Sequence, residues 1–282
     1  MKRQKRALAQ WNGRRSSSAR PGVVLMLHVG RCGSTVLANL LGQNDEIFWD
    51  GKIPRKAKQL YHDTTNGFDY ARWTRAQFDL SGGKYYGFEF KILADQYPAV
   101  FGTTTEEFLE TCRRIGVTHY VLLVRRNTLR HVVSHYASKN RGSWHAGANT
   151  KVEKKTFVLD PDDITTGQNQ GRPLLDYLFE VDAAHDLVRS KLSGENFLEL
   201  EYEGDIDEPG AQSAYNRICE FLKIAPGNVA IKNRKMNPFP LSDVIENHED
   251  LAELLSDTPY AWMLNEPETH QNAANAGERG RD

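Results

Sequence analysis

The sequence has few cysteines and no long apolar run. Its three cysteines, Cys32, Cys112 and Cys219, lie far apart among 282 residues, so they indicate neither a disulfide framework nor a cysteine-rich metal motif. The simplest expectation is therefore a reducing, cytoplasmic setting. No apolar stretch approaches the roughly 20 residues of a membrane-spanning helix, so we expect no stable insertion into a membrane.

Acidic residues are absent from the first part of the chain, between Met1 and Asn44, where only basic charges occur. We interpret residues 1–21 as a disordered basic tail, while their Arg and Ser content also fits a segment that targets an organelle. Over the whole chain the formal net charge is −1, which provides no general attraction to nucleic acid. We expect residues 22–264 to form a single domain and residues 265–282 to be a second disordered tail.

Predicted strands and helices alternate along the chain. Short apolar segments predict strands at residues 23–28, 85–91, 119–124 and 197–202. Helical periodicity predicts helices at residues 35–42, 104–115, 128–139, 173–191, 211–222 and 248–255. This alternation favours an α/β fold with a central parallel sheet flanked by helices. Residues 44–83 and 140–171 are expected to be irregular and to shape a binding pocket.

The most informative segment, residues 28–35, joins the first predicted strand to the first predicted helix. A turn of this kind aims backbone N–H groups and the positive end of a helix at one point, so it favours anion binding. Arg31 adds a fork of donors that suits phosphate or sulfate, and Ser34 and Thr35 add hydroxyl groups. The lysine that a nucleotide-triphosphate loop places before its serine is missing, which argues against ATP. A purely structural turn is the alternative.

Cys32 lies inside this loop and allows two interpretations. A thiol at a helix N-terminus can have a lowered pKa and act as a thiolate. A cysteine in such a position is more often a small residue that packs against its neighbours.

A second candidate phosphate site follows the predicted strand at residues 119–124. Arg126 comes directly after this strand, and Ser134 lies about two turns into the next helix. Ligands of open parallel sheets bind beyond the carboxyl ends of the strands. We therefore expect Arg126 and the loop at residues 28–35 to lie at the same edge of the sheet.

Together these motifs resemble the sulfotransferase family, whose members use 3′-phosphoadenylyl sulfate (PAPS) as the sulfuryl donor. The resemblance covers roughly residues 22–264 and implies the P-loop NTPase-like fold of that family. It includes the family's R-x-G-[ST]-[ST] loop and its Arg and Ser eight residues apart. The residues that the resemblance assigns to donor binding are Arg31, Cys32, Gly33, Ser34, Thr35, Arg126, Ser134 and Lys235.

The resemblance also implies a mechanism that needs PAPS as co-substrate and no metal. Lys91, at the end of a predicted strand, would neutralise the leaving oxygen. The general base departs from the family pattern, because Leu93 replaces one customary His and Lys52 replaces one customary Glu. Asp50 and Glu89 are the nearest carboxylates, and we rank Asp50 slightly ahead of Glu89.

The function that these features predict is transfer of a sulfuryl group from PAPS to a hydroxyl of a carbohydrate, lipid or small metabolite, which releases 3′,5′-adenosine bisphosphate (PAP). A non-catalytic protein that binds PAP or PAPS is one alternative, supported by Lys52. A small-molecule kinase is another, and the missing loop lysine disfavours it. His131 and His135 have the spacing of a metal pair on a helix, but the sequence places no third ligand, so we expect no metal.

Overall fold

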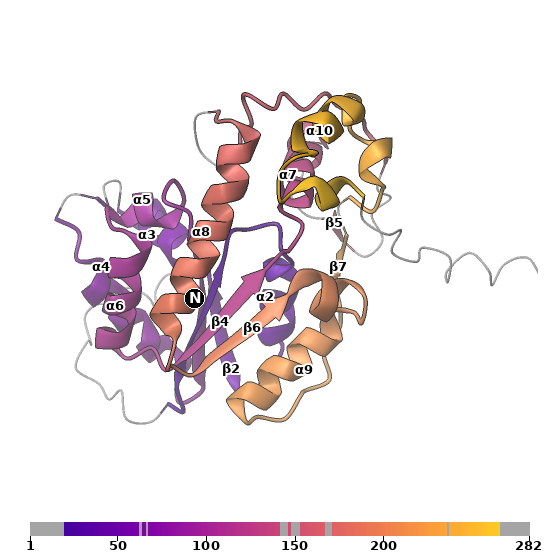
Figure 1. Cartoon of the computed structure of the whole chain (residues 1–282). Helices are drawn as coiled ribbons and strands as arrows, with labels where there is room; N and C mark the ends of the chain where they lie inside the picture. The colour runs from indigo at the N-terminus through magenta and orange to yellow at the C-terminus, as the bar shows by residue number, and fades with distance from the viewer. Residues whose placement is uncertain are drawn as a thin grey trace, which may run out of the picture.

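The computed structural model describes residues 20–61, 64–65, 67–141, 146–147, 153–166, 171–235 and 237–265 (Figure 1). Most of the two predicted tails lies outside these residues, so the predicted domain limits stay predictions. A five-stranded parallel sheet forms the centre, in the order β2-β3-β1-β4-β6. Its strands are β1 (Val23–His28), β2 (Ile47–Gly51), β3 (Tyr85–Lys91), β4 (His119–Val124) and β6 (Phe197–Glu201).

Helices surround this sheet. They are α2 (Ser34–Leu41), α3 (Ile53–Leu60), α4 (Tyr70–Gln77), α5 (Tyr97–Phe101), α6 (Thr105–Ile115), α7 (Thr128–Arg141), α8 (Leu174–Leu192), α9 (Ala211–Leu222) and α10 (His248–Leu255). Shorter helical turns are η2 (Phe78–Ser81), η3 (Tyr202–Asp207), η4 (Leu241–Asp243) and η5 (Ala261–Leu264). A separate antiparallel pair joins β5 (Ala146–Gly147) to β7 (Asn233–Arg234). None of the described helices is long and apolar enough to span a membrane.

The core has two layers, one on each face of the sheet. Side chains alternate along the central strand β1, so Leu25 and Leu27 enter one apolar cluster while Val24 and Met26 enter the other. Helices α2 and α9 cover the second face through residues such as Leu37 and Ile218, and α6 and α8 contribute to the first. Burial of the sheet on both faces explains why its central strands are nearly continuous apolar runs.

The predicted α/β architecture is confirmed, and the four predicted strands are present with their ends within one residue. The expectation that residues 44–83 are irregular is wrong, because β2, α3, α4 and η2 lie there. β2 is an edge strand and is only partly buried, so it lacks the apolar run of a central strand. Helix α3 carries several cations over a narrow apolar face, which weakens its hydrophobic signal.

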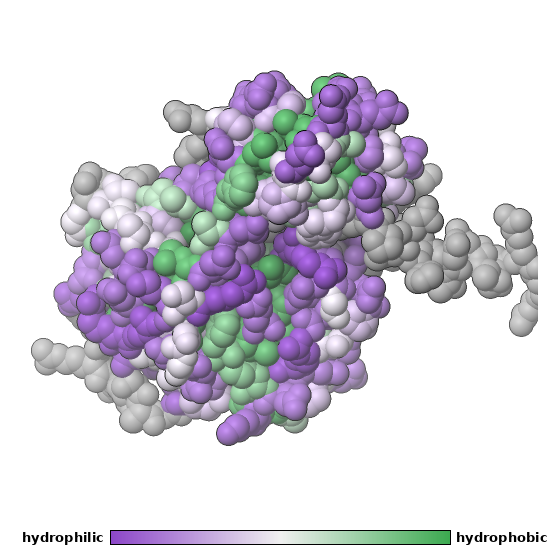
Figure 2. Space-filling view, viewed as in Figure 1, coloured by the Kyte–Doolittle hydropathy of each residue, from purple (hydrophilic) through white to green (hydrophobic). Residues whose placement is uncertain are grey.

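The carboxyl ends of the strands converge on one edge of the sheet. His28 pairs in register with Lys91, and Val124 pairs with Glu201, so four strands end at the same level. In Figure 1 the arrows of β4 and β6 run toward the region of α7 and α10. On the face shown in Figure 2, hydrophobic residues are limited to bands between larger hydrophilic areas. The segments that follow the strands at this edge hold the candidate site.

Candidate functional site

The glycine loop between β1 and α2 is a tight turn with three left-handed residues. Gly30, Arg31 and Gly33 have φ angles of 100°, 50° and 84°. Gly33 is also crowded, since a Cβ atom there would lie 2.9 Å from Cδ1 of Ile206. Glycine at this position is thus required both by backbone conformation and by space. The turn places the first residues of α2, with the positive end of the helix dipole, beside the loop.

Cys32 belongs to the core. Its side chain is completely buried in the apolar cluster beneath α2. Burial raises the pKa of its thiol to about 11, despite opposing backbone hydrogen bonds from Ser34 and Gly30. The thiolate interpretation is therefore wrong, and only the backbone of Cys32 is placed to contact a ligand in the loop.

Arg31 ties the loop to α7. Its Nε lies 3.0 Å from Ser134 Oγ, and its second terminal nitrogen donates to Ser134 Oγ and Ser138 Oγ, both at 2.8 Å. The Arg31 carbonyl accepts a hydrogen bond of 3.0 Å from Arg125. Burial and the charge of Arg125 lower the pKa of Arg31 to about 10, so its guanidinium stays charged at neutral pH.

Ser134 was predicted to share a ligand with Arg126, and the structure gives it a different neighbour. Ser134 accepts hydrogen bonds from Arg31, whereas the Arg126 guanidinium lies 3.7 Å from a carboxylate oxygen of Glu201. Arg126 also lies over the Trp262 ring, 5.8 Å from its centroid, and its side chain is 61% exposed. The eight-residue spacing thus places Ser134 beside the glycine loop and Arg126 in a neighbouring pocket.

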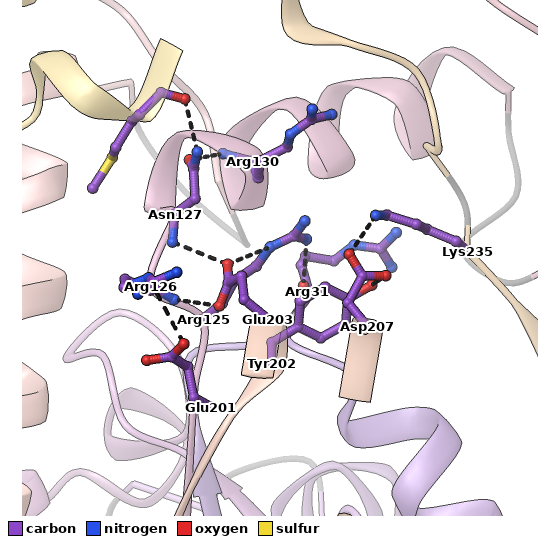
Figure 3. Close-up of polar contacts among 11 residues, drawn as sticks. Arg31, Arg125, Arg126, Asn127, Arg130, Glu201, Tyr202, Glu203, Asp207 and Lys235 are labelled. Carbon is purple, nitrogen blue, oxygen red and sulfur yellow. Dashed lines mark hydrogen bonds and ion pairs between the residues drawn. The ribbon is translucent and has the colours of Figure 1, made fainter. Parts of the chain in front are cut away.

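This pocket has a volume of about 430 Å³ and lies where β4 and β6 end (Figure 3). Four of its side chains are cationic, three are carboxylates and two are aromatic, with one amide. The lining residues are Arg125, Arg126, Arg130, Tyr202, Glu203, Asp207, Glu208, Lys235, Trp262 and Asn265. The volume is within the usual range for small-molecule sites, and the mixture of aromatic rings and cations suits a ligand with a flat ring and anionic groups.

Glu203 holds the backbone between β4 and α7, next to the pocket. Its carboxylate accepts hydrogen bonds from the backbone N–H groups of Arg126 and Asn127, at 3.0 and 3.1 Å. Asn127 in turn accepts from the N–H of Arg130 at 2.9 Å and donates to the Met263 carbonyl at 2.7 Å. These hydrogen bonds cap α7 and hold it against η5, so Arg126 and Trp262 are held next to each other.

Two further cations complete the pocket. Lys235 donates to a carboxylate oxygen of Asp207 at 2.6 Å, which brings the predicted Lys235 to the same pocket as Arg126. Arg125 lies over the Tyr202 ring, 4.5 Å from the centroid, and also bonds the Arg31 carbonyl. Arg125 therefore connects the pocket with the glycine loop, as Figure 3 shows.

Lys91 lies on the other side of the glycine loop. The position that a Cβ atom would take on Gly30 is 3.1 Å from Lys91 Nζ, so the ammonium group touches the loop. Burial and, to a smaller extent, the nearby charges of Lys52 and Arg31 lower the pKa of Lys91 to about 8. Lys91 is thus positioned against the segment that precedes Arg31.

The two candidate carboxylates lie on opposite faces of the sheet. Glu89 is 2% exposed, shares its face with Lys91, and lies 3.2 Å from His28 Nε2. Burial, the largest single influence, raises the pKa of the Glu89 carboxyl group, but the hydrogen bond and charge of His28 together with the charge of Lys52 outweigh it, so the net effect is a lowered pKa. Asp50 instead accepts from the Tyr86 hydroxyl at 2.7 Å and from Lys56 at 2.6 Å.

This geometry does not support the ranking of Asp50 ahead of Glu89. Tyr86 belongs to the apolar cluster on the face opposite Glu89, and the Asp50 carboxylate is held there by two donors. Glu89 is the carboxylate on the face of Lys91 and the loop. Their catalytic roles stay predictions.

His131 was considered only as a metal ligand, and the structure places it beside the glycine loop. Its Nδ1 hydrogen-bonds the Tyr177 hydroxyl, and its Nε2 lies 3.9 Å from the Cβ position of Gly30. Burial, followed by the charge of Lys91, holds the pKa of His131 well below its usual range, so the ring is neutral. Within the described residues, no group of three His, Cys, Asp or Glu side chains is arranged to hold a metal ion.

Comparison with known proteins shows a distant likeness in structure. No protein-family model matches the chain, and no curated protein matches it. Among solved structures, a sulfotransferase from Alicyclobacillus acidocaldarius is similar, with 15% identity and a TM-score of 0.48 over 88% of this chain and 95% of that chain. At this identity and TM-score, the likeness assigns neither residues nor chemistry to this chain.

Proposed function

We propose that this protein is a sulfotransferase that moves a sulfuryl group from PAPS to an acceptor hydroxyl and releases PAP. One observation carries the proposal: two cationic regions meet at the carboxyl edge of the sheet and are joined by Arg125. The first is the glycine loop with Arg31 and Lys91, and the second is the pocket of Arg126 and Lys235. PAPS likewise carries anionic groups at two positions of its ribose, the 5′-phosphosulfate and the 3′-phosphate.

The donor would span the two regions. The loop amides and Arg31 suit the 5′-phosphosulfate, because a helix N-terminus and a guanidinium both favour oxyanions. Arg126 and Lys235 suit the 3′-phosphate, and the Trp262 ring in the same pocket suits the adenine. ATP has its charge at the 5′ end alone, so it would bring no anionic group to the second pair of cations.

The transfer step needs charge stabilisation and a proton acceptor. As the acceptor oxygen bonds to sulfur, the bond between sulfur and the bridging oxygen breaks, and negative charge moves onto the leaving phosphate. Lys91, which is mostly protonated at neutral pH because its pKa is about 8, would stabilise that charge. Glu89 is ionised, because the combined influence of His28 and Lys52 outweighs burial and lowers its pKa, and it would take the hydroxyl proton.

The first test is a thermal-stability titration with PAP, adenosine 5′-phosphate and ATP, without added metal. A ligand at about 100 times its dissociation constant stabilises the folded state by roughly 2.7 kcal/mol. We expect a clear shift with PAP and much smaller shifts with the two nucleotides that lack a 3′-phosphate. Equal shifts with all three would overturn the donor assignment. Turnover of PAPS then distinguishes an enzyme from a protein that only binds PAP.

A further inference from the structure

A surplus of positive charge lies on the side of the site that the donor does not use. Lys52 directly follows β2, and Arg55 is one helical turn further along α3. Neither side chain forms an ion pair or hydrogen bond with another residue in the part of the chain that the structure describes. Both belong to the loop-and-helix segment between β2 and β3, next to the edge where Lys91 ends its strand.

Lys52 is close to the groups that would carry out the transfer. Gly51, its neighbour, has its Cβ position 3.8 Å from a carboxylate oxygen of Glu89. The charge of Lys52 contributes to lowering the pKa of Lys91 and of Glu89, so it acts on both. The charge of Arg55 likewise acts on Lys91 and on Tyr97, the first residue of α5.

The carboxylates nearby already have partners. Asp50 is held by Lys56 and Tyr86 on the opposite face of the sheet, and Glu89 is hydrogen-bonded with His28. The 5′-phosphosulfate of the donor would bring two negative charges, which Arg31 and Lys91 match. Lys52, which is half-buried, and Arg55, which is exposed, are then left over, and their positive charges at this edge of the site would attract an anionic group of a bound ligand.

We propose that the acceptor is itself anionic, and that Lys52 and Arg55 bind a carboxylate or sulfate group next to its reacting hydroxyl. This inference rests on the proposed function. It assigns Lys52 a role in place of the base that the family usually has at this position. Lys52 holds the acceptor, and Glu89 removes its proton.

The probe is inorganic sulfate, titrated by calorimetry at constant ionic strength into protein saturated with PAP. PAP fills the donor pocket except for the position of the transferred sulfuryl group, so the comparison of variants is what assigns further sulfate binding to Lys52 and Arg55. Wild type is compared with the Lys52→Ala/Arg55→Ala double variant and with a control, Lys84→Ala. Lys84 is exposed and lies before the amino end of β3, at the opposite edge of the sheet.

We expect saturable sulfate binding to wild type and to Lys84→Ala, and binding at least about tenfold weaker in the double variant, because charge-assisted hydrogen bonds are lost. PAP affinity should be equal in all three proteins. Sulfate binding that is equal in all three, or absent from the PAP-saturated wild type, would overturn the anionic acceptor. Failure of PAP to bind wild type would instead overturn the proposed function, so the two failures are distinguishable.

Discussion

At the scale of single residues, Arg126 is the most direct test of the donor pocket. Its guanidinium is exposed in the pocket, where it lies 3.7 Å from Glu201 and over the Trp262 ring, so its removal should leave the fold intact. Arg126→Ala should weaken PAP binding about tenfold or more, since a hydrogen bond to a charged group contributes about 1.5–3 kcal/mol. The measurement is the PAP dissociation constant. Arg72→Ala, which removes an exposed arginine near the start of α4, is the control and should bind PAP normally.

The lowered pKa of Lys91 predicts how the rate of sulfuryl transfer depends on pH. The protonated ammonium stabilises the leaving oxygen, and its pKa of about 8 lies well below that of an ordinary lysine. The transfer rate should therefore hold below pH 8 and fall as the pH rises through that value in the donor-free enzyme. Lys91→Met should lower the rate about 100-fold or more and remove this alkaline limb. The measurement is kcat/KM against pH, with the urea midpoint of each protein as the control for folding. A profile unchanged by the substitution would exclude Lys91 from the transfer step.

At the scale of elements, Gly33 links the glycine loop to η3. A side chain there would meet Ile206 at 2.9 Å, and the φ of 84° is unfavourable for any residue with a Cβ atom. Gly33→Ala should therefore lower the free energy of unfolding by about 1–3 kcal/mol and also weaken PAP binding. Gly194 offers a matched control, because its φ of 89° is similar and nothing lies within 4 Å of its Cβ position. Denaturant titrations of both variants separate the collision from the backbone cost. Equal losses would show that contact with η3 is unimportant.

The strength of the sequence signal differs between elements. The central strands β1, β3 and β4 were predictable because burial on both faces requires continuous apolar runs. The edge strand β2 and helix α3 were not, since an edge strand buries less surface and α3 surrounds a few apolar residues with lysine and arginine. The same holds for the site. The loop and Arg126 had local motifs, whereas Trp262 and Tyr177 reach the site only through tertiary packing.

Asp50 and Glu89 show why sequence distance to a motif did not identify the carboxylate that lies on the face of Lys91. They adjoin neighbouring strand ends, but the alternation of side chains sends them to opposite faces of the sheet. The sequence did not identify β2 as a strand, so it could not show which face of the sheet Asp50 would occupy. The position of Glu89 beside Lys91 follows from β3 alone, two residues apart on one strand.

At the scale of the whole molecule, several histidines are buried without charge and couple stability to pH. Burial lowers the pKa of both His135 and His185 to about 4, and it lowers the pKa of His131 as well. The unfolded chain takes up protons near pH 6.5, whereas the folded protein resists them until about pH 4. Folding stability is therefore full above pH 6.5 and is lost progressively as the pH falls toward 4.

His185 isolates this effect away from the candidate site. It lies in the middle of α8, is 3% exposed, and its Nε2 has no hydrogen-bond partner among the described residues. Between pH 6 and 4.5, one such histidine steepens the loss of stability by up to about 1.4 kcal/mol per pH unit. His185→Gln should reduce that slope, whatever its effect on absolute stability, because glutamine does not titrate. Urea titrations at several pH values measure it. Above pH 7 the ring is neutral in both states, so the two proteins should show parallel curves there, and parallel curves at low pH as well would refute a buried neutral His185.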